Sequence, residues 1–281
     1  MSIWSDTFVQ VEHRPYPVPA GTWTMHMSWQ ELLFAHWPFP AEVMRERITV
    51  ACGGWPAGLE LDTYEGRAWL SIVPFRMART GLRWWPTALG PHTFPELNVR
   101  TYVKAKDRTS GQERAGVFFF SLDAASPLAV FTARRWYHLP YFRARMACEP
   151  QALIAAPGAQ PDAPPAREPT RVTYASERTH SGAPPAVLRA RYGPTGPVRQ
   201  SSPGTLERWL TERYCLYAVD RKLRTWRSDI HHQLWPLQDA SAELERNDMG
   251  SCHGFELPSE KPLVQYVKNI DVVAWSPQRV G

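Results

Sequence analysis

The sequence contains few lysines, few cysteines and no long apolar run. Only five of its 32 basic residues are lysines, so chemistry that depends on a lysine amine has few candidates. The four cysteines stand far apart without a C-x-x-C pair, which argues against a disulfide framework or a zinc module. No apolar run reaches the ~18 residues of a membrane helix, and the first ten residues lack the basic and apolar parts of a secretory signal. We therefore expect a cytoplasmic protein without a membrane partner.

Several common catalytic motifs are also missing. The chain has no G-x-S-x-G elbow, no phosphate-binding P-loop and no G-x-G-x-x-G turn, so serine-hydrolase, nucleotide-triphosphate and dinucleotide functions lack their usual signals. The net charge of +5 raises the question of nucleic acid. The arginines, however, are spread from Arg14 to Arg279 among acidic residues, without a basic run or a zinc-finger spacing. We expect no nucleic-acid partner.

The residues that are abundant favour a β-rich fold. Aromatic residues make up 12% of the chain and there are 27 prolines, a composition typical of many short strands separated by turns. Residues 94–104 and 116–122 are predicted to form one pair of strands. A second pair is predicted within Leu59–Val73, joined by a turn at Glu65 and Gly66, with Pro74 ending the second strand.

Three short helices are predicted between the strands. Ser126 supplies a side-chain cap and Pro127 the first helical position, and the helical spacing continues until Pro140. Residues 40–48 and 203–210 also begin with proline. The pattern indicates an α+β protein, mainly antiparallel β, with a few peripheral helices.

The chain is predicted to form one large domain. Residues 1–26 form an N-terminal extension and residues 27–276 a single domain. A segment rich in proline and alanine, near 155–169, reads as an exposed connector between its two halves.

A series of short motifs resembles a known family. The matching motifs in the first half are Ser28-Trp29, Leu33-Phe34-Ala35-His36-Trp37-Pro38, Leu61-Asp62, Gly66-Arg67-Ala68-Trp69, Val73-Pro74-Phe75, Phe94-Pro95-Glu96-Leu97-Asn98-Val99-Arg100-Thr101-Tyr102-Val103, Ser121-Leu122-Asp123-Ala124, Leu139-Pro140-Tyr141 and Ala144-Arg145-Met146. Those in the second half are Leu206-Glu207, Leu210-Thr211-Glu212-Arg213-Tyr214, Ile230-His231-His232 and Trp235-Pro236-Leu237. With these motifs the chain resembles the YqjF-like family, the domain of unknown function 2071, over about residues 28–275.

This resemblance implies a fold similar to acetoacetate decarboxylase, an antiparallel β-barrel that encloses a pocket. In the decarboxylase a buried lysine forms a Schiff base with a keto acid. The corresponding segment here, Leu139–Arg143, contains proline but no lysine. Because a guanidinium does not condense with carbonyls, the resemblance implies a pocket without Schiff-base chemistry, and we expect no cofactor.

The main candidate site is a row of polar residues at alternating positions. On a strand, Glu96, Asn98, Arg100 and Tyr102 project from one face, while the apolar residues between them project from the other. Inside a barrel this row would bind a polar ligand, and Glu96 matches an acidic position of the decarboxylase pattern. The alternative is a solvent-facing strand or a buried structural network.

A second group of candidates follows the predicted helix at 126. Tyr141, Arg143 and Arg145 share one face of the next strand, where the arginines would clamp a carboxylate or a phosphate. The alternative is that these cations stabilise the carbonyl groups at the end of the helix. Arg213 enters a strand after a helix and either reaches the pocket or only packs.

Histidines raise a metal hypothesis that the spacing does not support. His36 and the pair His231 and His232 could meet only through the tertiary fold, because no H-E-x-x-H or similar motif is present. We expect no metal, and treat His36 as a candidate ligand-binding residue.

Three functions remain open from the sequence. The first is binding of a small polar or carboxylated molecule in a barrel cavity. The second is a lyase-like acid/base enzyme that uses Glu96 and an arginine, Arg100 or Arg143. The third is a structural or interaction protein whose barrel is filled by its 13 tryptophans and other side chains. An oligomer is compatible with each.

Overall fold

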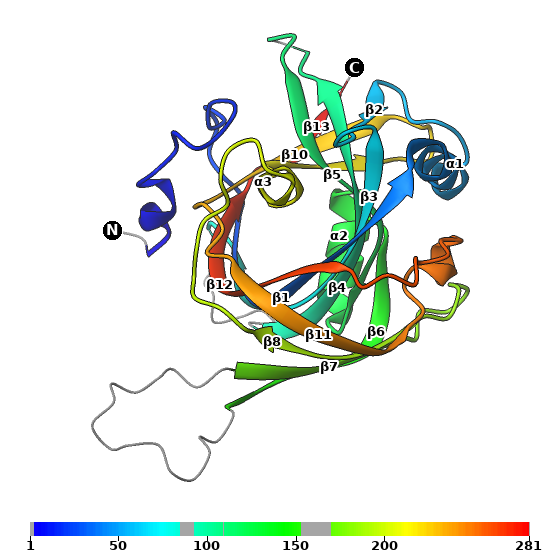
Figure 1. Cartoon of the computed structure of the whole chain (residues 1–281). Helices are drawn as coiled ribbons and strands as arrows, with labels where there is room; N and C mark the ends of the chain where they lie inside the picture. The colour runs from blue at the N-terminus through cyan, green and yellow to red at the C-terminus, as the bar shows by residue number, and fades with distance from the viewer. Residues whose placement is uncertain (1–2, 85–92, 109, 153–169, 281) are drawn as a thin grey trace.

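The computed structural model describes residues 3–84, 93–108, 110–152 and 170–280, and strands dominate it (Figure 1). The strands are β1 (Met25–Pro40), β2 (Leu59–Leu61), β3 (Arg67–Leu82), β4 (Thr93–Lys106), β5 (Glu113–Ala124), β6 (Tyr141–Ala152), β7 (Thr170–Arg178), β8 (Val187–Pro194), β9 (Cys215–Val219), β10 (Thr225–His232), β11 (Gln238–Asn247), β12 (Leu263–Ala274) and β13 (Gln278–Arg279). The helices are α1 (Ala41–Cys52), α2 (Pro127–Trp136) and α3 (Leu206–Thr211), with 3-10 turns at Ile3–Phe8 and Ser251–His253.

Strand pairing closes a ring. Following neighbours, β12 pairs with β1, β1 with β3, β3 with β4, β4 with β5, β5 with β9, β9 with β10, and β10 again with β12. All these pairs are antiparallel except β5 with β9. We call these seven strands the ring strands. Figure 1 shows the ring along its axis, with α2 behind it and α3 toward the viewer.

The other long strands form a second series of paired strands that connects two ring strands. β6, β7, β8 and β11 leave the ring at β5 and rejoin it at β12, and we call them the return strands. The ring strands between these two junctions therefore have apolar side chains on both faces. On β4, Leu97 and Val99 lie in the core shared with the return strands, whereas Phe94 and Tyr102 lie in the core inside the ring. This division follows from the alternation of side chains along a strand.

The strands predicted around residues 94–122 are confirmed, and one predicted strand end is wrong. β4 and β5 pair in antiparallel register from Glu96 and Ala124 onward. Pro74 does not end its strand, because β3 continues to Leu82. Proline lacks the N–H that a central strand donates to its neighbour. Here Pro74 lies where the ladder between β1 and β3 is interrupted, between the pairs of Gln30 and Ala35, so no regular bond is lost.

The predicted turn and helix cap are both present. Glu65 and Gly66 have positive φ values of 50° and 77°, as a tight turn requires. The predicted pairing of the two strands across this turn is wrong, because the short strand before it, β2, pairs with β4 through Leu61 and Val103. At α2, the Ser126 side chain accepts a hydrogen bond from the backbone of Ala129, so the predicted N-cap is confirmed.

The N-terminal residues pack against the outside of the ring. The Arg14 guanidinium donates to the carbonyl of Ile230 at 2.7 Å, and Phe8 and Trp23 pack against Val273 and Trp275. The predicted connector at 155–169 lies outside the described residues. Within the described ranges, no helix has the length and apolar character needed to cross a bilayer.

Candidate functional site

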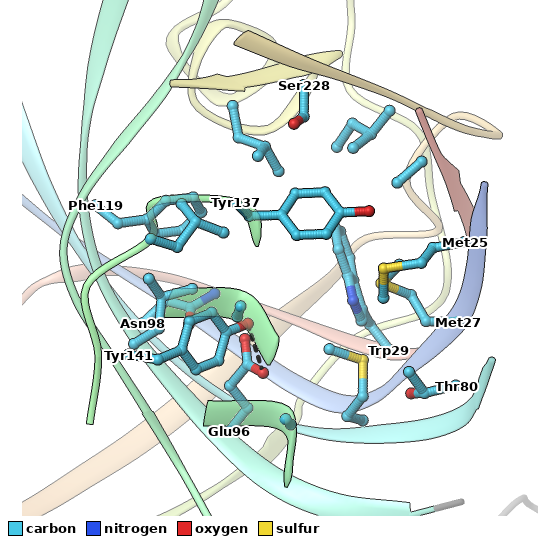
Figure 2. A pocket seen from close by; sticks show the side chains of 18 of the residues that line it. Met25, Met27, Trp29, Thr80, Glu96, Asn98, Phe119, Tyr137, Tyr141 and Ser228 are labelled. Atoms are coloured by element: carbon cyan, nitrogen blue, oxygen red, sulfur yellow. Dashed lines mark hydrogen bonds between the residues drawn. The ribbon is translucent and has the colours of Figure 1, made fainter. Parts of the chain in front are cut away.

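A cavity of about 500 Å³ lies inside the ring. Its wall is mostly apolar and aromatic, and a few polar side chains interrupt it (Figure 2). Two long strands contribute alternating residues, Met25, Met27 and Trp29 from β1 and Val73, Phe75 and Met77 from β3. An interior lined in this way can hold an organic molecule away from water.

Strand register orders the cavity from a mouth to a deep end. At the mouth, Met25 pairs with Leu82, and the side chain of Leu82 is 39% exposed. Helix α2 borders the same opening with Leu128 and Trp136, which are 59% and 61% exposed. The backbone N–H of Ala125, just before α2, donates to the carbonyl of Pro95, so this end of β4 lies near the mouth. Glu96, Asn98 and Arg100 then follow along β4 at increasing depth. The deep end therefore lies toward Arg100 and the residues that follow α3.

Glu96 lines the cavity and is 2% exposed. The Tyr141 hydroxyl donates a hydrogen bond to Glu96 Oε2 at 3.0 Å (Figure 2). Burial raises the pKa of the Glu96 carboxyl to about 8, against the opposing effect of hydrogen bonds from Tyr141 and Asn98. At neutral pH Glu96 is therefore mainly protonated, and it can both donate and accept a hydrogen bond in the cavity.

Arg100 supplies positive charge at the deep end. Its side chain is buried, with 7% of the residue exposed, and its guanidinium lies 5.2 Å from the centre of the Phe34 ring. Nε and Nη2 of Arg100 have no hydrogen-bond partner among the described residues. Burial lowers the pKa of this guanidinium, yet an arginine keeps its proton because its ordinary pKa is so high. Tyr102 is a hydrogen-bond partner of this side chain. The cavity thus contains a cation with unused donors at Nε and Nη2.

The neighbouring arginine is paired with a carboxylate, although its Nη2 also has no hydrogen-bond partner among the described residues. Arg213 follows α3, lines the cavity and bonds Asp62 Oδ2 through Nη1 at 2.6 Å. Its Nε donates to the carbonyl of Trp209 at 2.6 Å. Asn98 also has an unused atom, since its Oδ1 is buried without a partner. Buried polar groups are almost always hydrogen-bonded, so the unused atoms of Arg100 and Asn98 mark places where a ligand can bond.

The structure brings most of the predicted site residues together. Glu96, Asn98, Arg100, Tyr141 and Arg213 all line the cavity. The other three candidates lie outside its wall, and each has a physical reason. Arg143 is exposed, because β6 turns away from the ring at its third residue and pairs with β7. Its predicted place beside Tyr141 in the pocket is therefore wrong.

His36 and Tyr102 form a buried network behind the deep end. Ser71 Oγ lies 2.5 Å from His36 Nδ1 and 2.6 Å from the hydroxyl of Tyr102. Burial, together with the charge of Arg100, lowers the pKa of His36 well below its ordinary value. His36 is therefore neutral at pH 7, and it lies outside the wall of the cavity.

The paired histidines bond to backbone groups. His231 Nε2 lies 2.8 Å from the carbonyl of Thr7, and His232 Nδ1 lies 2.7 Å from that of Gln233. Burial lowers the pKa of His231 to about 3 and that of His232 to about 4. In the parts of the chain that the structure describes, no group of histidine, cysteine or carboxylate side chains has the arrangement of a metal site.

The sequence prediction missed the contribution of α2. Leu128, Ala129, Thr132, Ala133 and Trp136 all line the cavity. Their spacing, i, i+1, i+4, i+5 and i+8, places them on one helical face, which the sequence shows. Only the tertiary structure shows that this face borders the cavity. Tyr137, directly after α2, extends its ring across the centre of the space (Figure 2).

Lysine is absent from the wall. All five lysines lie in described segments, and none of them lines the cavity. Lys104, for example, bonds Glu113 at 3.0 Å on the outside of the sheet.

Comparison with known proteins identifies the family. Residues 26–271 match the domain of unknown function 2071, described as an uncharacterized conserved protein. The chain belongs to this family. It is 39% identical over 258 residues to the uncharacterized protein YqjF of Bacillus subtilis (strain 168), covering 92% of this chain and 93% of that protein. The predicted family is thereby confirmed.

Solved structures confirm the predicted fold class. The enduracididine biosynthesis enzyme MppR complexed with pyruvate matches with a TM-score of 0.57 and 12% identity, covering 96% of this chain and 93% of that one. An acetoacetate decarboxylase-like enzyme from Sphingomonas wittichii RW1 matches with a TM-score of 0.52 and 14% identity, covering 96% and 98%. The protein thus has an acetoacetate decarboxylase-like fold, mainly antiparallel β with few helices.

Proposed function

We propose that this protein binds a small organic carboxylate in the cavity inside the ring, without Schiff-base chemistry. The observation that carries the proposal is Arg100, a buried guanidinium with two unused donors that faces an apolar cavity. An unpaired charge is costly to bury, and a carboxylate that accepts both donors would relieve that cost. Two further facts support a carboxylate. Glu96 is mainly neutral at pH 7, so it does not repel an anion, and Arg213 is already paired with Asp62.

The absence of lysine from the wall supports binding by charge rather than by covalent attachment. A Schiff base needs an amine that loses its proton near neutral pH, and a guanidinium does not. The open space also fits poorly with the third function considered above, an interior filled by side chains. MppR, which shares the fold, was solved with pyruvate bound.

Calorimetric titration of a set of carboxylates tests the proposal. The wild type should bind at least one of pyruvate, benzoate and octanoate, and Arg100→Met should weaken that binding about 10- to 100-fold, the cost of a charge-assisted hydrogen-bond pair. Arg143→Met is the matched control, since it removes an exposed arginine outside the wall. The proposal is wrong if Arg100→Met binds as tightly as the wild type, or if none of the three acids binds.

A second candidate function is acid/base catalysis on the bound acid, with Glu96 as the proton carrier. It is favoured by the raised pKa of Glu96, about 8, which suits a group that exchanges a proton near neutral pH. Arg100 would orient the substrate, since Arg143 lies outside the cavity. If the protein is such an enzyme, an acid that binds should be consumed, and Glu96→Gln should bind it but stop its turnover. Binding without any product, followed by NMR over many hours, would leave only the first function.

A further inference from the structure

Resting on the proposed function, we infer that the carboxylate carries a long apolar tail: the ligand is an amphipathic monocarboxylate that enters head first. Arg100 lies at one end of the cavity, and the exposed apolar side chains of Leu128 and Trp136 lie at the other. A small keto acid would fill only the region around Arg100.

The first argument is the order of groups along the cavity. β4 places Glu96 near the start of α2 and Arg100 four residues further in, opposite Ser71 and Phe119. Arg213, which follows α3, lies close enough for its charge to lower the pKa of Arg100. The guanidinium therefore lies at the α3 end, away from the α2 mouth. When a carboxylate reaches it, the rest of the ligand must lie in the part of the cavity between Arg100 and the mouth, which we call the stem.

The second argument is the chemistry of that stem. Between Arg100 and the mouth the apolar part of the wall is built of Trp29, Phe75 and Phe94, and Glu96 and Asn98 interrupt it. Three methionines line its outer part, Met25, Met27 and Met77. Methionine side chains are flexible and polarisable, and they adapt to apolar groups of different shape. A tail that lay against them would lose its contact with water, which is the main driving force for binding an alkyl chain.

The third argument is the mouth itself. Leu128 and Trp136 line the cavity and also face solvent, with exposed fractions of 59% and 61%. Because both residues belong to the inner wall and the surface at once, the apolar path continues to the outside. A tail longer than the stem could extend between them.

A chain-length series tests this inference on the wild-type protein. Titrating pyruvate, butanoate, hexanoate, octanoate and decanoate, each below its micelle concentration, should give an affinity that rises about fourfold per added methylene. The rise should stop where the tail reaches solvent at the mouth. Pyruvate or butanoate binding as tightly as decanoate would overturn the inference.

Two variants of α2 give the direction of the tail. Ala133 lines the cavity, so Ala133→Phe should shorten the tail that binds best and leave butanoate unaffected. Phe131 is 69% exposed and is not part of the wall, so Phe131→Ser is the matched control and should bind the whole series like the wild type. If Ala133→Phe does not fold, the wild-type series alone decides.

The two proposals fail in different ways. If short and long acids bind equally and both need Arg100, the tail is refuted and the carboxylate site stands. If long acids bind equally well to Arg100→Met, the head-first arrangement is refuted together with the carboxylate site. An octanol affinity equal to that of octanoate would have the same meaning, because octanol has the tail without the charge.

Discussion

The two faces of the ring strands differ in whether their buried polar side chains have hydrogen-bond partners. The face toward the return strands is closed by Tyr174, Tyr192 and Tyr266, each at most 1% exposed. Their hydroxyls are all used: Tyr174 donates to the carbonyl of Glu96, Tyr192 to that of Glu31, and Tyr266 to the Glu31 side chain. The face toward the cavity instead leaves Arg100 and Asn98 with unused atoms.

This difference separates a structural role from a binding role. A buried hydroxyl that reaches a backbone carbonyl stabilises one arrangement of strands, and nothing remains for a ligand. A buried guanidinium with unused donors costs free energy in the empty protein, and an anion that accepts those hydrogen bonds relieves that cost.

Truncating a large aromatic residue should cost more on the tyrosine face than on the cavity face. Tyr192→Ala should lower the free energy of unfolding by about 3–5 kcal/mol, because it opens a hole in a close-packed core. Phe119→Ala should cost about 1–2 kcal/mol, because one side of Phe119 already borders open space and loses fewer contacts. Urea unfolding of both variants measures this, and equal costs would contradict the comparison.

Glu96 should make the protein less stable as the pH rises. Its pKa of about 8 in the folded protein lies above the ordinary value of 4.5. Between these values the folded protein holds a proton that the unfolded chain has released, so stability is present at low pH and is lost toward pH 8. Relative to Glu96→Gln, the wild type should lose about 1.4 kcal/mol per pH unit in this window.

Chemical denaturation at several pH values measures this slope, and Glu46→Gln is the control because Glu46 is exposed. A wild-type slope equal to that of Glu96→Gln would show that Glu96 is ionised throughout.

Removing single hydroxyls should separate the two faces by a smaller amount. Tyr192→Phe leaves the carbonyl of Glu31 without that partner and should cost about 1–2 kcal/mol of unfolding free energy. Tyr141→Phe should instead act on Glu96, because the Tyr141 hydrogen bond lowers the pKa of that carboxyl. Its loss should raise the pKa further, which the infrared band of the protonated carboxyl reports during a pH titration. A band unchanged by Tyr141→Phe would argue against the contact.

The smallest effect is expected at the arginine outside the cavity. Arg143→Met should change the unfolding free energy by less than about 0.5 kcal/mol, as for most exposed positions. Arg100→Met removes a buried charge with unused donors and should leave stability equal or higher, although it weakens carboxylate binding. Thermal unfolding in the absence of ligand distinguishes the two variants. A clear loss of stability in Arg100→Met would mean that Arg100 is structural.

The parts of the site that depend on local alternation could be predicted from the sequence. Glu96, Asn98 and Arg100 share a strand face because their side chains recur every second residue, and no tertiary information is needed for that. The cap at Ser126 is equally local. The resemblance of the motifs to a known family then predicted the acetoacetate decarboxylase-like fold, which composition alone could not predict.

The parts that depend on pairing between distant strands could not be predicted. Pro74 looked like a strand end, and only the interruption opposite it in β1 allows the strand to continue. Arg143 shares a strand with Tyr141, yet β6 leaves the ring after pairing with Leu122 to Ala124, so the two side chains have different surroundings. Whether a helical face meets solvent or a cavity is also a tertiary property, which is why α2 was missed.

A crystal structure with terminally brominated octanoate tests the central claim most directly. Anomalous scattering locates the bromine without ambiguity, and the electron density locates the carboxylate. We expect the carboxylate on Nε and Nη2 of Arg100 and the bromine near Leu128 and Trp136 at the mouth. A bromine beside Arg100, or a cavity without the acid at a concentration that saturates binding in solution, would contradict the account.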